Sequence, residues 1–318
     1  MVDSVYLWIG FGVFVAGMLA LDLGVFHRKA HETSLREAAT WTAVWVVLAL
    51  GFHAAVYFLR DRTAALEFLT GYLIEWSLSM DNVFVFAIIF TYFAVPKLYQ
   101  HRVLFWGILS AVVMRLTYIL VGAALLQRFH WVLYVFGAIV LLAGVKVFRH
   151  GGKDIHPERN PVLVLARKYL RVTPTLEGAR FLVRKNGALF ATPLFLVLLE
   201  VEATDVVFAV DSIPAIFAIT RDPFVVFTSN VFAILGLRAL YFLLAGVMGM
   251  FRYLDKGLAL ILCFIGVKML LSDFYHIPIG VSLGVVLLIL AIAVAASIVA
   301  ARAERRAGWG EQVLEGKA

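Results

Sequence analysis

Acidic side chains inside long apolar stretches constrain this chain more than any other feature of its sequence. The segment Glu75–Asn82 (EWSLSMDN) lies between LTGYLI and VFVFAIIFTYFAV, which places two carboxylates and an amide well inside an apolar run. A charged side chain at the bilayer centre costs roughly 2.5–3.5 kcal/mol on insertion scales, and such residues usually mark a functional path. The pattern occurs a second time in VLLEVEATDVVFAVDSIPAIFAI. We therefore expect a membrane protein that uses these acidic residues.

The composition predicts an all-α, polytopic membrane protein. Of the 318 residues, 63% are hydrophobic and 15% are charged, whereas a soluble chain carries about 25% charged residues. The apolar runs continue over about 17 residues or more, which favours membrane helices over the alternating strands of a barrel. Nine spans are predicted, over residues 5–26, 40–59, 66–94, 103–126, 131–148, 188–219, 224–248, 257–272 and 277–301.

The distribution of basic residues predicts the orientation of the chain. One set of loops carries 20 Lys and Arg, and the opposite set carries four. By the positive-inside rule, the N-terminus lies outside and the C-terminus lies in the cytoplasm. The same distribution accounts for the net charge of +7 without a nucleic-acid partner. The first span lacks the features of a cleaved signal peptide, because its positive charges follow it.

Two segments are predicted to be copies of one three-span unit. Their acidic motifs share a six-residue spacing, and each is followed by Arg-x-x-Tyr and then by Gly-Val-Lys. Because three is an odd number, the copies are expected to lie in opposite orientations, as in many secondary transporters. The aligned pairs are Glu75 with Asp205, Asp81 with Asp211, Asn82 with Ser212, Arg115 with Arg238, and Gly144 with Gly266.

The spans and the repeat divide the chain into five predicted parts. Two N-terminal helices precede repeat A, a basic cytoplasmic loop follows it, and repeat B precedes the last helix and a tail. The loop is expected to lie on the anionic leaflet, with a regulatory or partner-binding role as the alternative. The boundaries of the five parts are 1–65, 66–149, 150–187, 188–273 and 274–318.

The geometry of a regular helix limits how the acidic residues can meet. Glu75 and Asn82 share one face, and Asp81 points about 120° away from Glu75. The carboxylates can therefore converge only if the helices are broken, or if each helix faces a cavity from two sides. Asn82, Ser212 and Pro214 suit a break, which would expose carbonyl groups as further ligands.

The candidate ligands are oxygen atoms, which suit hard divalent cations such as Mn²⁺, Mg²⁺ or Ca²⁺. The single cysteine, Cys263, excludes a multi-thiolate site and an intramolecular disulfide. Arg115 and Arg238 are expected to balance charge, which leaves two negative charges on the paired acids, enough for one divalent ion. Burial favours protonated carboxyl groups, so metal binding is expected to release protons, and proton/metal antiport follows as a hypothesis.

Four long motifs carry a resemblance to a known family: LDLGVFHRKAHE, EWSLSMDNVFVFA, VEATDVVFAVDSIPAIFAIT and TSNVFAILGLRALYFLL. With these motifs the chain resembles the TerC/Alx family of bacterial integral membrane proteins over about residues 5–300. The resemblance implies metal-ion homeostasis at the inner membrane, chiefly manganese export, with the ion as substrate and no cofactor. The ion-path residues that it implies are Glu75, Asp81, Asn82, Glu202, Thr204, Asp205, Asp211 and Ser212, with Asp22 as a candidate for the vestibule.

Two other functions compete with transport. A membrane scaffold or stress-response partner would use the basic loop for docking and carry no ion. An intramembrane aspartyl protease would also need paired acids, but neither GxGD nor PAL occurs in the sequence. We therefore expect no enzyme. The sequence leaves open which divalent ion is carried, and it leaves open the oligomeric state.

Overall fold

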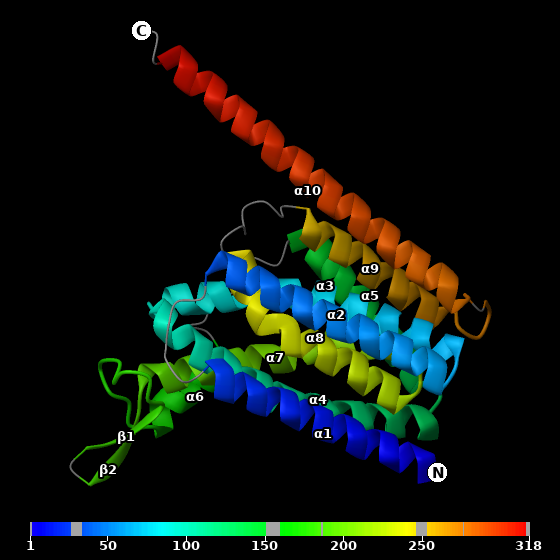
Figure 1. The fold of residues 1–318 in the computed structure, drawn as a ribbon, viewed down its shortest axis with the longest axis horizontal. Coiled ribbons are helices and arrows are strands. Elements are labelled where there is room, and N and C mark those ends of the chain that lie inside the picture. The colour runs from blue at the N-terminus through cyan, green and yellow to red at the C-terminus, as the bar shows by residue number, and fades with distance from the viewer. Residues whose placement is uncertain are drawn as a thin grey trace.

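The computed structural model describes residues 2–26, 34–150, 160–185, 187–245, 253–275 and 277–315, with the side chains of 2–4, 21–26, 81, 150, 245 and 302–315 left aside. This part of the chain forms a bundle of long helices, with the last helix projecting from one end (Figure 1). The elements are α1 (Val2–Phe26), α2 (Leu35–Leu59), α3 (Arg62–Tyr92), α4 (Lys97–Arg128), α5 (Val132–His150), α6 (Pro161–Tyr169), β1 (Leu182–Lys185), β2 (Ala188–Ala191), α7 (Pro193–Phe217), α8 (Pro223–Ala245), α9 (Leu254–Leu270) and α10 (Ile279–Glu315).

The helices agree with the predicted class of polytopic α-helical membrane protein. Within the described residues, six helices are long and apolar enough to cross a membrane: α2, α3, α4, α5, α8 and the first part of α10. α1 contributes a shorter apolar stretch, Val5–Ala20. The apolar sequence of α7 contains four acidic residues, and α9 has only 17 residues. Nine crossings therefore stay a prediction.

A small antiparallel hairpin departs from the all-α prediction. β1 pairs with β2 from Leu182↔Ala191 to Lys185↔Ala188, and Gly187 in the connection has a φ of +78°. The predicted span over 188–219 therefore began too early, because Ala188–Ala191 forms strand hydrogen bonds instead. The helix starts at Pro193, where proline lacks only an N–H that would have no helical partner.

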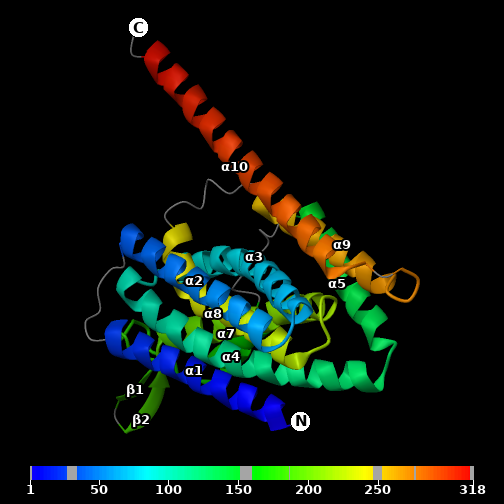
Figure 2. The same ribbon diagram turned by 45° about the vertical axis from the view of Figure 1, so that its right-hand side comes forward.

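An aromatic cluster attaches the two N-terminal helices to the rest of the bundle. Phe11 of α1 and Phe52 of α2 both pack against Phe232 of α8, with ring centroids 5.9 Å and 4.9 Å apart. Phe68 of α3 completes the cluster, with its ring centroid 5.1 Å from that of Phe52 and 5.8 Å from that of Phe232. Aromatic pairs of this kind add about 0.5–1.5 kcal/mol each beyond the area that they bury. α1 and α2 thus cover one flank of the bundle (Figure 2).

Close helix contacts connect the two segments that were aligned as repeats. α3 packs on α8, α4 packs on α7, and α5 packs along α9. A Cβ added to Gly144 of α5 would lie 2.8 Å from the backbone nitrogen of Cys263 in α9. A Cβ added to Gly266 would lie 2.7 Å from the backbone nitrogen of Leu141. The two glycines therefore let the α5 and α9 backbones approach each other closely.

The expected helix breaks are absent. α3 runs without interruption over Arg62–Tyr92, so Asn82 lies within a continuous helix. α7 likewise runs over Pro193–Phe217 and includes Ser212 and Pro214. Pro214 lies inside this helix, where it removes the hydrogen bond that an N–H would donate to the Val210 carbonyl oxygen, and the helix ends three residues later. The acidic residues are thus presented by regular helices.

Candidate functional site

Arg115 of α4 lies at the centre of the acidic region and joins three other helices. Its guanidinium donates to Glu75 of α3, to Asn230 of α8 and to Ser212 of α7, the last at 3.2 Å. The other terminal nitrogen donates to Asp205 of α7 at 3.3 Å. Arg115 is 1% exposed and Glu75 is fully buried. One cation therefore bridges the two carboxylates that the repeat alignment had paired.

Several buried oxygen atoms around Arg115 accept no hydrogen bond from it. Among the described residues, no group donates a hydrogen bond to Glu75 Oε2, Asp205 Oδ2, Asn82 Oδ1 or Ser79 Oγ, although all four are buried. A buried acceptor without a partner costs free energy, on the order of 1–3 kcal/mol. The region is thus rich in hard oxygen atoms that are available to a further cation or to water.

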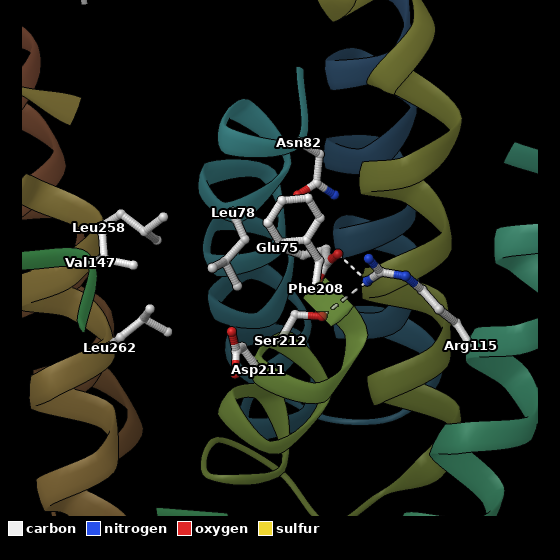
Figure 3. A pocket seen from close by; sticks show the side chains of 10 residues that line it. All are labelled: Glu75, Leu78, Asn82, Arg115, Val147, Phe208, Asp211, Ser212, Leu258 and Leu262. Atoms are coloured by element: carbon white, nitrogen blue, oxygen red, sulfur yellow. Dashed lines mark hydrogen bonds and ion pairs between the residues drawn. The ribbon is translucent and has the colours of Figure 1, made fainter. Parts of the chain in front are cut away.

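A cavity opens next to this bridge, between α3, α7 and the α5–α9 pair (Figure 3). The space between its lining residues, with the open solvent at its mouth counted in, is about 380 Å³. The far wall is apolar, formed by α5 and α9. The polar lining consists of Glu75, Asn82, Arg115, Asp211 and Ser212, and the apolar lining consists of Leu78, Val147, Phe208, Leu258 and Leu262.

The cavity brings Asp211, from the aligned pair Asp81–Asp211, into the site. Asp211 and Ser212 approach it from α7, while Glu75 and Asn82 approach it from α3 (Figure 3). Asp211 and Ser212 are adjacent residues on different sides of α7, whereas Glu75 and Asn82 share one face of α3. Asp211 has Lys146 of α5 as an electrostatic neighbour. The side chain of Asp81 lies outside the described residues, as does that of Asp22.

Asp205 contacts the site through Arg115 without lining the cavity, and two further predicted ion-path residues, Glu202 and Thr204, do not line it either. Glu202 accepts a hydrogen bond from Ser110 of α4, on the side of α7 where Gly107 allows close packing. Thr204 donates to the Glu200 carbonyl oxygen of its own helix at 2.8 Å. Neither of them lines the cavity. Arg238, the counterpart of Arg115, is half-buried on α8 and takes part in interactions of its own.

The sequence reasoning missed Asn230 as a site residue. Asn230 is fully buried on α8, and its amide oxygen accepts from Arg115. The signal was present, because Thr-Ser-Asn interrupts an otherwise apolar span at 228–230. Polar residues in membrane helices usually face the bundle interior. An amide there was a candidate partner for a mid-span arginine.

The described side chains do not form a ready-made metal cluster. Among them, no group of three or more His, Cys, Asp or Glu is close enough to hold a metal ion. The carboxylates of Glu75 and Asp205 are turned to Arg115 instead. An ion in this region would therefore need a rearrangement of side chains, or would use the remaining carboxylate, amide and hydroxyl oxygens.

The fold and this site define a multi-pass α-helical membrane protein with a buried ionic centre. The model of the integral membrane protein TerC family matches residues 60–305. This match covers both acidic motifs and more than half of the chain. The chain therefore belongs to the TerC family of integral membrane proteins.

Relatives from several bacteria match nearly the whole chain. A Myxococcus xanthus protein named "Uncharacterized membrane protein STKORF319" is 52% identical over 95% of this chain and 94% of its own length. An Escherichia coli protein named "Putative membrane-bound redox modulator Alx" is 53% identical over 90% of this chain and 92% of its own length. A Rickettsia bellii protein named "Uncharacterized membrane protein" is 42% identical over 92% of this chain and 97% of its own length. No solved structure matches the chain.

Proposed function

We propose that the protein is a secondary transporter of a divalent metal cation, with Mn²⁺ export as its main activity. The observation that carries the proposal is the meeting of Glu75 and Asp205 in the bundle interior, beside a cavity that Asp211 also lines. Buried carboxylates in a membrane bundle are costly, and they usually belong to an ion or proton path. The ion is the substrate, and no resident cofactor is needed.

The chemistry of the lining supports a hard divalent cation. The polar atoms that face the cavity are carboxylate, amide and hydroxyl oxygens, apart from the Asn82 amide nitrogen and the Arg115 guanidinium. Such oxygen sets suit Mn²⁺, Mg²⁺ and Ca²⁺, whereas soft ions prefer thiolates. The choice of manganese and of the export direction rests on the resemblance to the TerC/Alx family. Proton coupling is part of the proposal because the same carboxylates can carry protons.

The contacts between the aligned segments support an inverted repeat. Gly144 meets Cys263 and Gly266 meets Leu141, and a shift of 122 residues maps the first pair onto the second with the roles of α5 and α9 exchanged. The sequence numbers rise along α5 as they fall along α9, so the helices run antiparallel. Copies related in this way fit the alternating-access design of secondary transporters.

A second pair of contacts shows the same relation. Gly71 of α3 lies against Ser229 of α8, and Gly107 of α4 lies against Val201 of α7. In the alignment α3 corresponds to α7 and α4 to α8. Exchanging the two copies therefore maps the Gly71–Ser229 contact onto the Gly107–Val201 contact, with an offset of one residue between Ser229 and Gly107. We place the ion path between the copies for this reason.

The name of the E. coli relative, "Putative membrane-bound redox modulator Alx", raises a redox role. Cys263 is the only cysteine of the chain, so an intramolecular dithiol–disulfide cycle is excluded. Cys263 also lies against Gly144 in the α5–α9 contact. A redox role would therefore need an external partner or would follow from the metal content of the cell.

Total cellular metal, measured by elemental mass spectrometry, tests the proposal. A manganese-sensitive bacterium under manganese load would carry wild type, Asp81→Asn, Asp211→Asn or an empty vector at equal expression. Asp222→Asn serves as a control, because Asp222 forms an exposed ion pair with Arg60 away from the cavity. We expect wild type and the control to lower cellular manganese selectively, and both site variants to match the vector.

Equal manganese in all strains would contradict transport and favour the scaffold function. The scaffold function also predicts that deletions within 150–187 abolish the stress phenotype while Asp81→Asn leaves it intact. The N-outside, C-cytoplasmic orientation is a separate part of the proposal, and it rests on the basic loops. Accessibility of cysteines introduced at loop positions, probed from each side of the membrane, tests it.

A further inference from the structure

We propose that the Arg115 guanidinium is a tethered internal cation, which occupies the acidic site in the absence of an ion and is displaced when a divalent cation binds. This inference rests on the proposed function and concerns the regulation of the same site. It assigns to Arg115 the role of a positioning residue that sets ion affinity and release. It goes beyond charge balance, because it makes the arginine and the ion compete for the same oxygens.

The geometry of the bridge carries the first step. A structural arginine–carboxylate pair commonly uses two parallel hydrogen bonds to one carboxylate. Arg115 instead contacts one oxygen of Glu75 and one oxygen of Asp205, on different helices. Among the described residues, nothing donates to the second oxygen of either carboxylate. The guanidinium thus lies where a cation shared between the two carboxylates would lie. It leaves two of their four oxygen atoms, Glu75 Oε2 and Asp205 Oδ2, without a hydrogen bond.

The neighbouring neutral groups carry the second step. Asn230 Oδ1 and Ser212 Oγ accept hydrogen bonds from Arg115. Both oxygens would become ligands of an ion that replaced the guanidinium. Asn82 is 2% exposed, its Oδ1 has no partner among the described groups, and it lines the cavity beside the bridge. Displacement would therefore free an all-oxygen set of the kind that hard divalent cations bind.

The charge balance of the site supports the displacement of Arg115 by a divalent ion. Glu75 and Asp205 form an uncompensated buried pair of anions if the site holds no cation, which is strongly unfavourable in a membrane interior. With Arg115 in place, the empty transporter can remain folded and change conformation without an ion. A divalent ion carries twice the charge of the guanidinium, so it can compete for the carboxylates once it has entered the cavity. Return of Arg115 would then help to release the ion.

Mn²⁺ binding to purified protein, measured by isothermal titration calorimetry, tests the inference. Arg115→Met removes the competitor, and we expect its Kd for Mn²⁺ to fall roughly tenfold or more below that of wild type, because two buried anions are left to the ion alone. Arg60→Met is the control, since it breaks an exposed ion pair outside the site. Its Kd should equal that of wild type. A merely structural Arg115 predicts the opposite, because its loss would disorder the ligands and weaken binding.

Arg115→Lys keeps the test decisive if Arg115→Met does not fold. Lysine preserves the charge but cannot bridge two carboxylates with a planar fork, so it competes less well. We expect Mn²⁺ to bind this variant several-fold more tightly than wild type. Unchanged or weaker binding by Arg115→Lys overturns the inference. If wild type transports Mn²⁺ in that case, only the role of Arg115 is wrong, whereas absence of binding and flux in every protein overturns the proposed function as well.

Discussion

Gly144 of α5 lies directly against Cys263 of α9, so closely that a Cβ on Gly144 would come within 2.8 Å of the Cys263 backbone nitrogen. The contact recurs in reverse where Gly266 of α9 meets Leu141 of α5. The α5–α9 pair also forms the apolar wall of the cavity, through Val147, Leu258 and Leu262. The close packing of these two helices therefore bears on both stability and the shape of the site.

Gly144→Ala is expected to destabilise the protein. The new methyl group would meet backbone atoms of α9, which cannot turn away as a flexible side chain can, and overpacking of this kind costs about 1–3 kcal/mol. Gly10→Ala in α1 is the matched control, because nothing lies within 4 Å of its Cβ position. Thermal unfolding in detergent should show a lower Tm for Gly144→Ala alone. Equal Tm values for both variants would contradict the close approach.

Asp205→Asn is expected to lower the free energy of unfolding by about 1.5–3 kcal/mol, because it removes one charge-assisted hydrogen bond from the buried Arg115, which keeps Glu75 as its counter-ion. The pair Arg60–Asp222 offers a comparison near the surface, with side chains 33% and 29% exposed. Asp222→Asn should cost at most about 1 kcal/mol, as exposed ion pairs do. Denaturant or thermal unfolding of the purified variants measures both. A smaller loss for Asp205→Asn than for Asp222→Asn would show that the buried bridge does not hold the helices together.

Glu202→Gln is expected to keep most of the manganese transport that Glu75→Gln abolishes. Glu202 does not line the cavity, and its partner is Ser110. A glutamine oxygen can still accept that hydrogen bond. Uptake or efflux of Mn²⁺ in cells at matched expression measures both variants. Loss of transport in Glu202→Gln to the level of Glu75→Gln would place the path on the Ser110 side of α7 instead.

Asp273 provides a pH-dependent contact at one end of the bundle. Hydrogen bonds from Tyr134 and His130 lower the pKa of the Asp273 carboxyl below its usual range. Since the folded pKa lies below the unfolded one, this contact contributes stability above the unfolded pKa, about 3.9. The contribution is lost as the pH falls through the folded pKa.

The matched variant for this contact is Asp273→Asn. Its Tm should lie below that of wild type at pH 7, and the difference should shrink as the pH is lowered below about 4. Thermal unfolding across this pH range measures the difference. A gap that stays constant with pH would show that the Asp273 charge does not contribute.

Much of the helical fold could be predicted from apolar runs, because each long run must satisfy its backbone groups within one helix. Six of the predicted spans correspond to helices that can cross a membrane by length and composition. The hairpin was missed, although Asn186-Gly187 between LVRK and ALFA is a strong hairpin signal in sequence. The error at residue 188 arose because apolar content was read as membrane span without regard to that turn.

The site was less predictable than the fold. The sequence indicated which residues are polar within apolar spans, and it paired Glu75 with Asp205 through the repeat. It did not indicate that one arginine contacts both, since this depends on how α3, α4 and α7 pack in space. It also did not indicate that Glu202 faces α4, where it accepts a hydrogen bond from Ser110. Periodicity gives the face of a helix but not the neighbour of that face.

Manganese flux into proteoliposomes that contain only the purified protein tests the central claim most directly. The comparison is wild type, Asp211→Asn, and Glu177→Gln as a control, because Glu177 pairs with Lys185 in the loop region. Asp211 lines the cavity, and Asp211→Asn keeps the side chain's size while removing its charge. We predict a saturable Mn²⁺ flux for wild type and Glu177→Gln, and background flux for Asp211→Asn. Flux through wild type no faster than through empty liposomes would contradict the account.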